Sequence, residues 1–320
     1  MSEEIQLRPL RVTRKEVIAR DVYLFELRDP SGANLPSFDA GSHIALRVPG
    51  GAMRQYSLCN DPSDTDRYQI AVKREAMGRG GSIALVDKVM VADTVMVATP
   101  SNMLPIDAKA KNFILIAGGI GITPMIAIMR SLIAEGLRNV KLYYFTRDAE
   151  GTAFLEELAK APFAKFTTII HSQGAAASKF DLWSILERPV SGTHLYCCGP
   201  KRLMDGVKDM TGHWPTSSIH FESFGADTKP HADDTPFDVV LKRSGQKIAV
   251  GSSQSILEAL RNANVHVPSS CESGTCGSCK VTYTDGQVSH RDLALLDEEK
   301  SNQIIVCVSR ATSSELVLDL

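Results

Sequence analysis

Residues 271–280 read CESGTCGSCK, and twenty-seven residues separate the last cysteine of this stretch from Cys307. The spacing of Cys271, Cys276 and Cys279, followed by one distant cysteine, is the ligand pattern of plant-type iron–sulfur sites. Four thiolates offset the charge of the irons, and a loop that supplies three of them wraps most of a cluster. The stretch therefore predicts a [2Fe–2S] site bound by these four cysteines.

A zinc site is the alternative for the same cysteines. Structural zinc sites favour two Cys-x2–4-Cys pairs, whereas this chain has one crowded triplet and one single cysteine. A Rieske centre requires histidine ligands, and the loop has no Cys-x-His pair. The total of seven cysteines is odd, which does not indicate a disulfide framework.

The sequence around this loop predicts a small α+β domain over residues 236–320. Ser255 and Glu258 have the spacing of a capping box, which marks the start of a helix over 256–263. The strands expected in this part are 237–242, 247–250, 303–308 and 315–318. Residues 225–236 collect Gly, Pro, Asp and Thr without periodicity, which is typical of a linker.

The middle of the chain alternates apolar strands with helices. The loop GGIGITP at 118–124 stands between an apolar run and a helical stretch, where a pyrophosphate can meet a helix N-terminus. Strands are expected at 113–117, 140–145, 166–171, 194–198 and 219–223, and helices at 125–134, 153–160 and 202–210. This pattern predicts a doubly wound parallel sheet.

The first third of the chain is rich in short strands separated by Gly, Pro, Asn and Asp turns. The strands expected are 22–27, 43–48, 68–73 and 94–98, with a short helix at 82–88. Such spacing predicts a small antiparallel barrel. We therefore divide the chain into residues 1–107, 108–226, a linker at 227–235, and 236–320.

The composition excludes several classes of protein. The 320 residues include 43% hydrophobic residues and carry a formal net charge of −2, which is typical of a globular protein and argues against nucleic-acid binding. No apolar run approaches the roughly 18 residues that a membrane-spanning helix needs. The polar start of the chain does not resemble a signal peptide, so a cytoplasmic protein is expected.

Five segments together resemble one family: RQYSLCN at 54–60, GGIGITPM at 118–125, YCCGP at 196–200, HFESFGA at 220–226, and the cysteine loop. In combination they resemble the ferredoxin–NADP reductase superfamily, with a C-terminal plant-type ferredoxin domain added. This layout is similar to that of the phthalate dioxygenase reductase family, the class IA reductases of ring-hydroxylating oxygenases. The resemblance covers nearly the whole chain. It implies an FMN-binding β-barrel, an NAD-binding α/β domain and a β-grasp ferredoxin domain.

The resemblance assigns the flavin to the barrel. Arg54 would bind the flavin phosphate through its planar fork, Tyr56 would stack on the isoalloxazine, and Ser57 would lie near its N5 atom. From the residues alone, ordinary strand positions and a plain surface turn remain open. The flavin-binding residues implied are Arg54, Gln55, Tyr56, Ser57, Ala71, Val72, Lys73, Arg79, Gly80, Gly81 and Ser82.

The resemblance also implies how NADH is bound. Cys198 would lie against the nicotinamide, Glu222 would orient a hydroxyl or the nicotinamide, and Phe224 would cover the isoalloxazine face. An acidic residue after the second strand favours NADH and a basic one favours NADPH. Because Asp148 favours NADH and Arg147 favours NADPH, the choice of NADH rests on the resemblance. The remaining residues implied are Gly118, Gly119, Ile120, Gly121, Thr123, Pro124, Thr146, Gly199 and Pro200.

The implied function is electron transfer in aromatic-hydrocarbon catabolism. A hydride from NADH would reach FMN, with Ser57, Cys198 and Glu222 as catalytic residues, and single electrons would pass through the cluster to a terminal oxygenase. A monomer is expected, without nucleic-acid or membrane partners. The alternatives are the reductase of another oxygenase or O-demethylase, such as the vanillate type, and a non-enzymatic redox sensor. A sensor would not need the three catalytic residues together.

Overall fold

The computed structural model describes residues 6–78, 80–136, 139–173, 180–224, 233–269, 272, 274–275, 277–292 and 294–320. These residues form two compact units. One unit holds most of the chain up to residue 223, and the other holds the chain from residue 224 onward. Among the described helices, none has the length and apolar character needed to cross a membrane.

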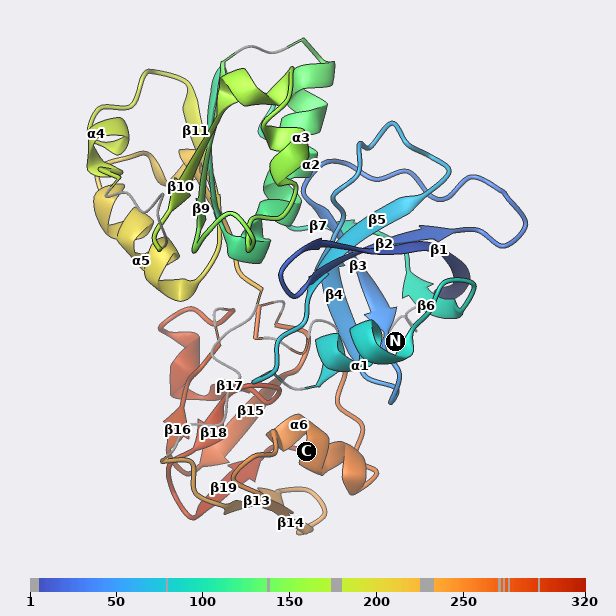
Figure 1. The fold of residues 1–320 in the computed structure, drawn as a ribbon. Helices are drawn as coiled ribbons and strands as arrows, with labels where there is room; N and C mark the ends of the chain where they lie inside the picture. The colour runs from blue at the N-terminus through green and yellow to red at the C-terminus, as the bar shows by residue number, and fades with distance from the viewer. Residues whose placement is uncertain are drawn as a thin grey trace. The chain divides into compact units, whose positions relative to one another are not determined.

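The N-terminal part of the larger unit is an antiparallel barrel (Figure 1). Its elements are β1 (Leu7–Ala19), β2 (Val22–Arg28), β3 (Ser42–Arg47), β4 (Met53–Ser57), β5 (Tyr68–Lys73), α1 (Gly81–Lys88), β6 (Thr94–Ala98) and β7 (Ser101–Asn102). The strand order is β4-β3-β6-β1-β2-β5, with β7 paired to β3. A bridge between Leu58 and Ile70 and a 2.9 Å hydrogen bond from the Cys59 amide to the Gln69 carbonyl join the two ends of this order.

The second part of the larger unit is a five-stranded parallel sheet of order β10-β9-β8-β11-β12. Its strands are β8 (Asn112–Gly118), β9 (Val140–Thr146), β10 (Thr167–His171), β11 (Thr193–Cys198) and β12 (Ile219–Glu222). Its helices are η1 (Gly119–Gly121), α2 (Ile122–Ala134), α3 (Leu155–Leu158), η2 (Phe163–Phe166), α4 (Trp183–Leu186), α5 (Lys201–Met210) and η3 (Thr216–Ser218). The order of the strands reverses between β8 and β11, which is where ligands bind in such sheets.

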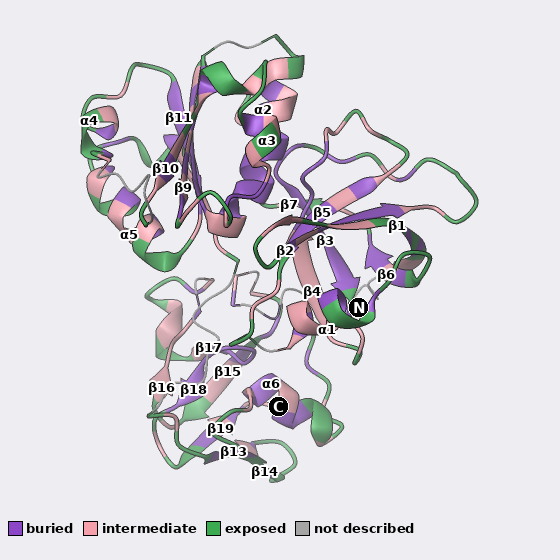
Figure 2. Ribbon diagram, in the orientation of Figure 1, coloured by how far each residue is buried: buried purple, intermediate pink, exposed green. Residues whose placement is uncertain are grey.

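Helices cover both faces of this sheet, with α2 and α3 on one side and α4 and α5 on the other (Figure 1). The strands between them are largely buried (Figure 2). The apolar core on the α2 side continues into the barrel, since Met125 and Met129 of α2 share it with Val22, Leu24 and Ala71. The barrel and the sheet are therefore held together by a continuous hydrophobic contact.

The smaller unit has a mixed sheet of order β14-β13-β19-β15-β17 and a separate pair, β16-β18. Its elements are β13 (Phe237–Leu241), β14 (Lys247–Val250), α6 (Ile256–Asn262), β15 (Lys280–Asp285), β16 (Val288–Ser289), η4 (Glu299–Ser301), β17 (Gln303–Ile305), β18 (Arg310–Ala311) and β19 (Glu315–Leu318). The apolar residues of α6 pack into the core of the sheet. The predicted capping box is present, with hydrogen bonds of 3.0 and 3.1 Å between Ser255 and Glu258.

Candidate functional site

Ser57 and Glu222 meet although 165 residues separate them in the chain. Ser57 ends barrel strand β4 and is 4% exposed, while Glu222 ends β12 of the parallel sheet. The Ser57 Oγ donates a hydrogen bond of 3.3 Å to Glu222 Oε2. This contact joins a predicted flavin residue to a predicted nicotinamide residue at one point.

Burial raises the pKa of Glu222 to about 8, and the hydrogen bond from Ser57 offsets only part of that rise. A carboxyl group in poorly hydrated surroundings favours its neutral form, because the charged form loses its water. At neutral pH the carboxyl of Glu222 is therefore mostly protonated, so that it carries a proton that it can donate to a neighbouring acceptor.

Cys198 lies beside this pair. It ends the central strand β11, and its partners in register are Ala117 of β8 and Glu222 of β12. Its thiol is fully buried, and burial raises its pKa well above the ordinary value, with the Glu222 carboxyl adding to the rise. A neutral buried thiol is a poor nucleophile, so the arrangement suits a side chain that shapes the site.

The glycine loop crosses closely over the end of β11. A Cβ atom at Gly121 would lie 2.2 Å from the Cys198 carbonyl oxygen, and one at Gly118 would lie 2.6 Å from Pro200 Cδ. Both glycines are required by this close crossing. No side chain caps the start of α2, and backbone N–H groups at a helix N-terminus attract anions. The loop therefore fits a pyrophosphate.

Thr123 and Pro124 lie in the first turn of α2 and are buried. The Thr123 hydroxyl donates a hydrogen bond of 3.1 Å to the Ile120 carbonyl, which fixes the loop. Gly119 is fixed in the same way, because its carbonyl accepts a 3.1 Å hydrogen bond from the hydroxyl of Tyr144. These two hydrogen bonds hold the backbone of the loop against α2 and β9.

The residues after β9 form a polar network. The Thr146 hydroxyl lies 2.9 Å from His171 Nδ1 and 2.8 Å from the Thr152 hydroxyl. Asp148 forms an ion pair with Arg20 of the barrel, which holds the pKa of Asp148 below its usual range. Arg147 is exposed. Asp148 is therefore ionised, and its negative charge is already paired with the positive charge of Arg20.

Arg54 and the start of α1 come together in the barrel. A Cβ atom at Gly81 would lie 2.7 Å from Arg54 Nε, so only glycine leaves room for that side chain. Gly80 adopts φ 79°, and no side chain caps the helix. A guanidinium beside uncapped helix N–H groups is a suitable cradle for a phosphate. Arg79 lies outside the described residues.

The other predicted flavin residues lie on β4, β5 and α1. Ala71 and Val72 are buried on β5, whereas Lys73 is exposed and pairs with Glu75 at 3.2 Å. The Ser82 hydroxyl accepts a 3.1 Å hydrogen bond from the Glu75 amide. Gln55 and Tyr56 lie on β4 and are half-buried. Phe224 is 46% exposed and belongs to the smaller unit.

Two of the four predicted cluster ligands lie in the described part of the smaller unit. Cys279 and Cys307 are buried, and the Val306 amide donates a 3.3 Å hydrogen bond to the Cys279 carbonyl, which joins their two segments. Gly277 has a positive φ of 73°, which suits a tight loop. Cys271 and Cys276 lie outside the described residues. The described thiols fit a thiolate-bound cluster.

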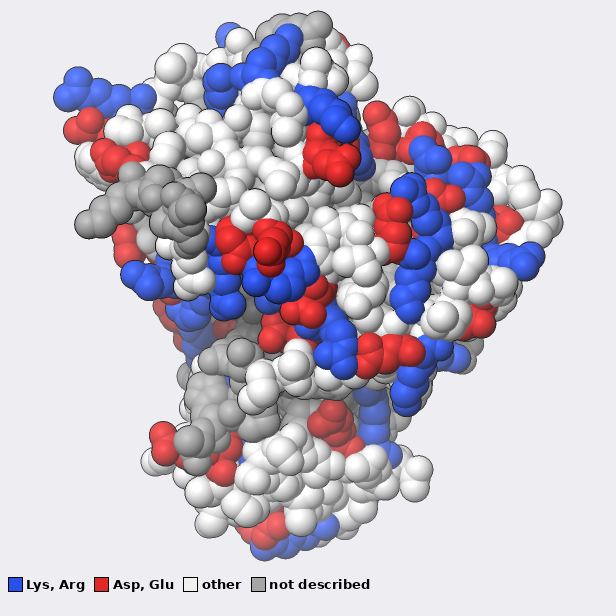
Figure 3. Space-filling model, in the orientation of Figure 1, with Lys and Arg blue, Asp and Glu red and all other residues white. Residues whose placement is uncertain are grey.

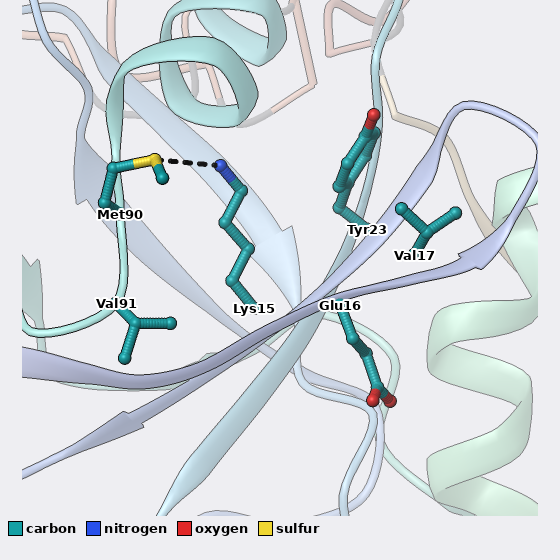
Figure 4. Close-up of a pocket in the computed structure, with 6 residues that line it drawn as sticks. All are labelled: Lys15, Glu16, Val17, Tyr23, Met90 and Val91. Carbon is teal, nitrogen blue, oxygen red and sulfur yellow. Dashed lines mark hydrogen bonds between the residues drawn. The ribbon is translucent and has the colours of Figure 1, made fainter.

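A shallow pocket on the barrel contains none of the predicted site residues (Figure 4). It is lined by Lys15, Glu16, Val17, Tyr23, Met90 and Val91. The Lys15 ammonium donates to the Val86 and Val89 carbonyls at 2.6 and 2.9 Å, so it binds the C-terminal end of α1. This pocket is accounted for by the folding of the barrel.

Two groups of contacts, those of Arg130 and those of a histidine pair, were not predicted from the sequence. Arg130 of α2 contacts the barrel, and its signal in the sequence is a single charge within an otherwise apolar helix, ITPMIAIMRSLIA. His194 and His220 share a 3.0 Å hydrogen bond and stack with their ring centres 5.3 Å apart. The histidines lie 26 residues apart in the chain, and only the pairing of β11 with β12 brings them together.

Comparison with known proteins assigns the domains. Three family models match: the oxidoreductase FAD-binding domain over residues 9–104, the oxidoreductase NAD-binding domain over 115–209, and the 2Fe-2S iron-sulfur cluster binding domain over 239–312. These matches and the sheets described above confirm the predicted fold class. They also confirm an oxidoreductase with flavin, NAD and [2Fe–2S] sites.

The similarity to known reductases extends over almost the whole chain. The phthalate dioxygenase reductase of Burkholderia cepacia is 55% identical over 97% of each chain. The phthalate 4,5-dioxygenase oxygenase reductase subunit of Pseudomonas putida is 51% identical over 97% of this chain and 96% of its own. A solved structure of phthalate dioxygenase reductase, 54% identical, matches with a TM-score of 0.89 over 98% of both chains. The chain belongs to the phthalate dioxygenase reductase family.

Proposed function

We propose that the chain transfers electrons from NADH, through FMN and a [2Fe–2S] cluster, to a terminal oxygenase component that acts on phthalate or a related aromatic acid. The observation that carries the proposal is the hydrogen bond between Ser57 and Glu222, which joins the flavin barrel to the nucleotide sheet. The oxygenase is inferred from the names of the two relatives, both reductases of phthalate dioxygenases.

The bound cofactors supply hydride transfer, its division into single electrons, and one-electron storage. The residues of the chain bind and orient the flavin and NADH. Arg54 and the start of α1 hold the flavin phosphate, and Ser57 lies near the N5 atom of the flavin ring. The uncapped start of α2 binds the pyrophosphate of NADH. Cys198 and Glu222 line the nicotinamide position and exclude water from it.

The other roles follow the same assignment. Gln55, Tyr56, residues 71–73 and Phe224 contact the flavin, and residues 146–148 contact the adenosine ribose. Four thiolates, those of Cys271, Cys276, Cys279 and Cys307, hold the cluster. The cofactor-binding domains are residues 1–107 and 108–226, followed by a linker at 227–235 and the ferredoxin domain at 236–320.

The choice of FMN is supported by the resemblance and by the lack of an obvious segment in the sequence for the adenosine half of FAD. We also propose a cytoplasmic monomer. A vanillate-type reductase would use the same residues, because the aromatic ring binds the partner and not this chain. A redox sensor is less well supported, since Ser57, Cys198 and Glu222 converge on one site, which a sensor does not need.

One experiment tests these choices together. The purified holoprotein is mixed with NADH and with either a phthalate-type or a vanillate-type oxygenase, each with its own aromatic acid, and product is measured. Released flavin is identified by chromatography. We expect FMN, rapid NADH-dependent cytochrome c reduction, and product with the phthalate-type oxygenase. Faster turnover with the vanillate-type oxygenase would contradict the proposed partner, and absence of cytochrome c reduction would contradict the enzyme.

A further inference from the structure

Arg130 makes a polar contact between the nucleotide sheet and the barrel. It lies on α2, its side chain is 15% exposed, and one guanidinium N–H donates to the backbone carbonyl of Cys59. The other guanidinium nitrogens donate to Glu157, with distances of 3.0, 2.7 and 2.7 Å. Its Cζ also lies 5.8 Å from the centre of the Phe154 ring. The arginine is thus held firmly on its own side of the contact.

The carbonyl that Arg130 binds belongs to a fixed part of the barrel. Cys59 stands two residues after Ser57, and both its amide and its thiol donate to the Gln69 carbonyl, at 2.9 and 3.3 Å. Its segment therefore links the end of β4 to β5, the two strands that carry Ser57 and Ala71. A displacement of the Cys59 backbone would therefore displace both strands.

The other end of α2 carries the glycine loop. Arg130 stands eight residues after Ile122, which is about 12 Å along a rigid helix at 1.5 Å per residue. The core that α2 shares with the barrel is apolar, and apolar contacts have no preferred direction. A charged donor on a carbonyl is directional, so it fixes the register between helix and barrel.

We propose that Arg130 is a positioning residue that fixes the nucleotide-binding loop of α2 relative to Ser57 of the barrel, and so sets how closely the nicotinamide approaches the flavin. This inference rests on the proposed function. Reactions between bound groups depend steeply on separation, and a displacement of about 1 Å can lower a rate by roughly 10²-fold. Glu157 supports the contact by orienting the guanidinium.

Rapid mixing of the holoprotein with saturating NADH tests the proposal through three variants. For Arg130→Met, which keeps an apolar side chain but removes the donors, we expect flavin reduction to slow by about 10- to 100-fold. NADH affinity and flavin content should change by less than about threefold, since the binding groups remain. The rates of flavin reduction of Arg130→Lys and Glu157→Gln should lie between those of Arg130→Met and the wild type. The long-wavelength charge-transfer absorbance of the NADH complex should weaken in the same order.

Arg28→Met is the matched control, because Arg28 pairs with Glu26 and Asp66 within the barrel alone. Hydrogen exchange of the flavin-loaded protein without NADH provides an independent readout: the amides of residues 58–60 should exchange faster in Arg130→Met and not in Arg28→Met. Unchanged flavin reduction and unchanged exchange, even with a lower melting temperature, would overturn the proposal. If the wild type failed to reduce its flavin with NADH, the proposed function would fail, while the exchange comparison would still decide the role of Arg130.

Discussion

The protonation of Glu222 affects its hydrogen bond with Ser57. Its carboxyl accepts the hydrogen bond of Ser57 when it is ionised, which turns the serine proton away from any other acceptor. A protonated Glu222 accepts this hydrogen bond less strongly, because it carries no full charge, which leaves the serine hydroxyl more available to an acceptor atom of a bound flavin. The protonation state of Glu222 therefore changes how strongly the carboxyl competes for the Ser57 hydroxyl.

We therefore expect the rate of flavin reduction at saturating NADH to fall as the pH rises through about 8, the pKa of Glu222. Glu222→Gln cannot ionise, and its flavin reduction should be independent of pH in that range. Stopped-flow measurements from about pH 6 to 9.5, at constant ionic strength, provide the check. A pH dependence that persists unchanged in Glu222→Gln would assign the proton to another group.

Residue types and spacing predicted the cluster cysteines and the nucleotide loop, whereas the family resemblance supplied the roles of the other site residues. The cysteine spacing and the glycine loop were recognisable from the residues alone, and RQYS through the family resemblance. The structure places RQYS on β4 and the glycine loop at the end of β8. The contact between Ser57 and Glu222 was not predictable from spacing, because it depends on how the barrel packs against the sheet. Arg130 was missed for the same reason, although a lone charge in an apolar helix was a signal.

At the scale of elements, the pairing of β11 with β12 creates the histidine pair. The His220 ring stacks with those of His194 and Tyr196, with centres 5.3 and 4.4 Å apart. An Asp107 carboxylate oxygen lies 3.9 Å from His194 Nδ1. Burial lowers the pKa of His220, the nearby His194 lowers it further, and Asp107 raises it only in part.

The sign of the resulting pH effect follows from linkage. A histidine whose folded pKa is depressed binds its proton more readily in the unfolded chain, so the folded state loses stability as the pH falls below the unfolded pKa of about 6.5. We expect thermal unfolding of the wild-type holoprotein to shift to lower temperature between about pH 7.5 and 5.5. The shift should be smaller in His220→Gln. Equal shifts in both proteins would exclude the histidine pair as the source.

Element boundaries show where sequence patterns were weak. Strand β1, Leu7–Ala19, was not predicted, because most of its residues are only half-buried or exposed and charges interrupt its alternation. The helix expected at 153–160 is confined to Leu155–Leu158. In contrast, α2 begins three residues earlier than expected, since Pro124 fits within its first turn. Strongly apolar parallel strands were predicted well.

At the scale of the molecule, charge is spread without a dominant sign. The formal net charge is −2, and Lys and Arg are interspersed with Asp and Glu over the face shown in Figure 3. A global field therefore does not select an electron acceptor. The chain is modular instead: apart from Phe224, the described residues proposed for the flavin and the nucleotide lie in one compact unit, and the described cluster cysteines lie in the other.

The central claim is that electrons move from NADH to the flavin and then, one at a time, to the cluster. Rapid mixing of NADH with the wild type and with Cys307→Ser, followed by visible absorbance and by electron paramagnetic resonance of frozen samples, tests it most directly. The wild type should reduce its flavin first and its cluster afterwards. Cys307→Ser should lose or destabilise the cluster yet reduce its flavin within about twofold of the wild-type rate, because the hydride site holds no cluster ligand. Collapse of flavin reduction in a folded, flavin-loaded Cys307→Ser protein would contradict this order of transfer.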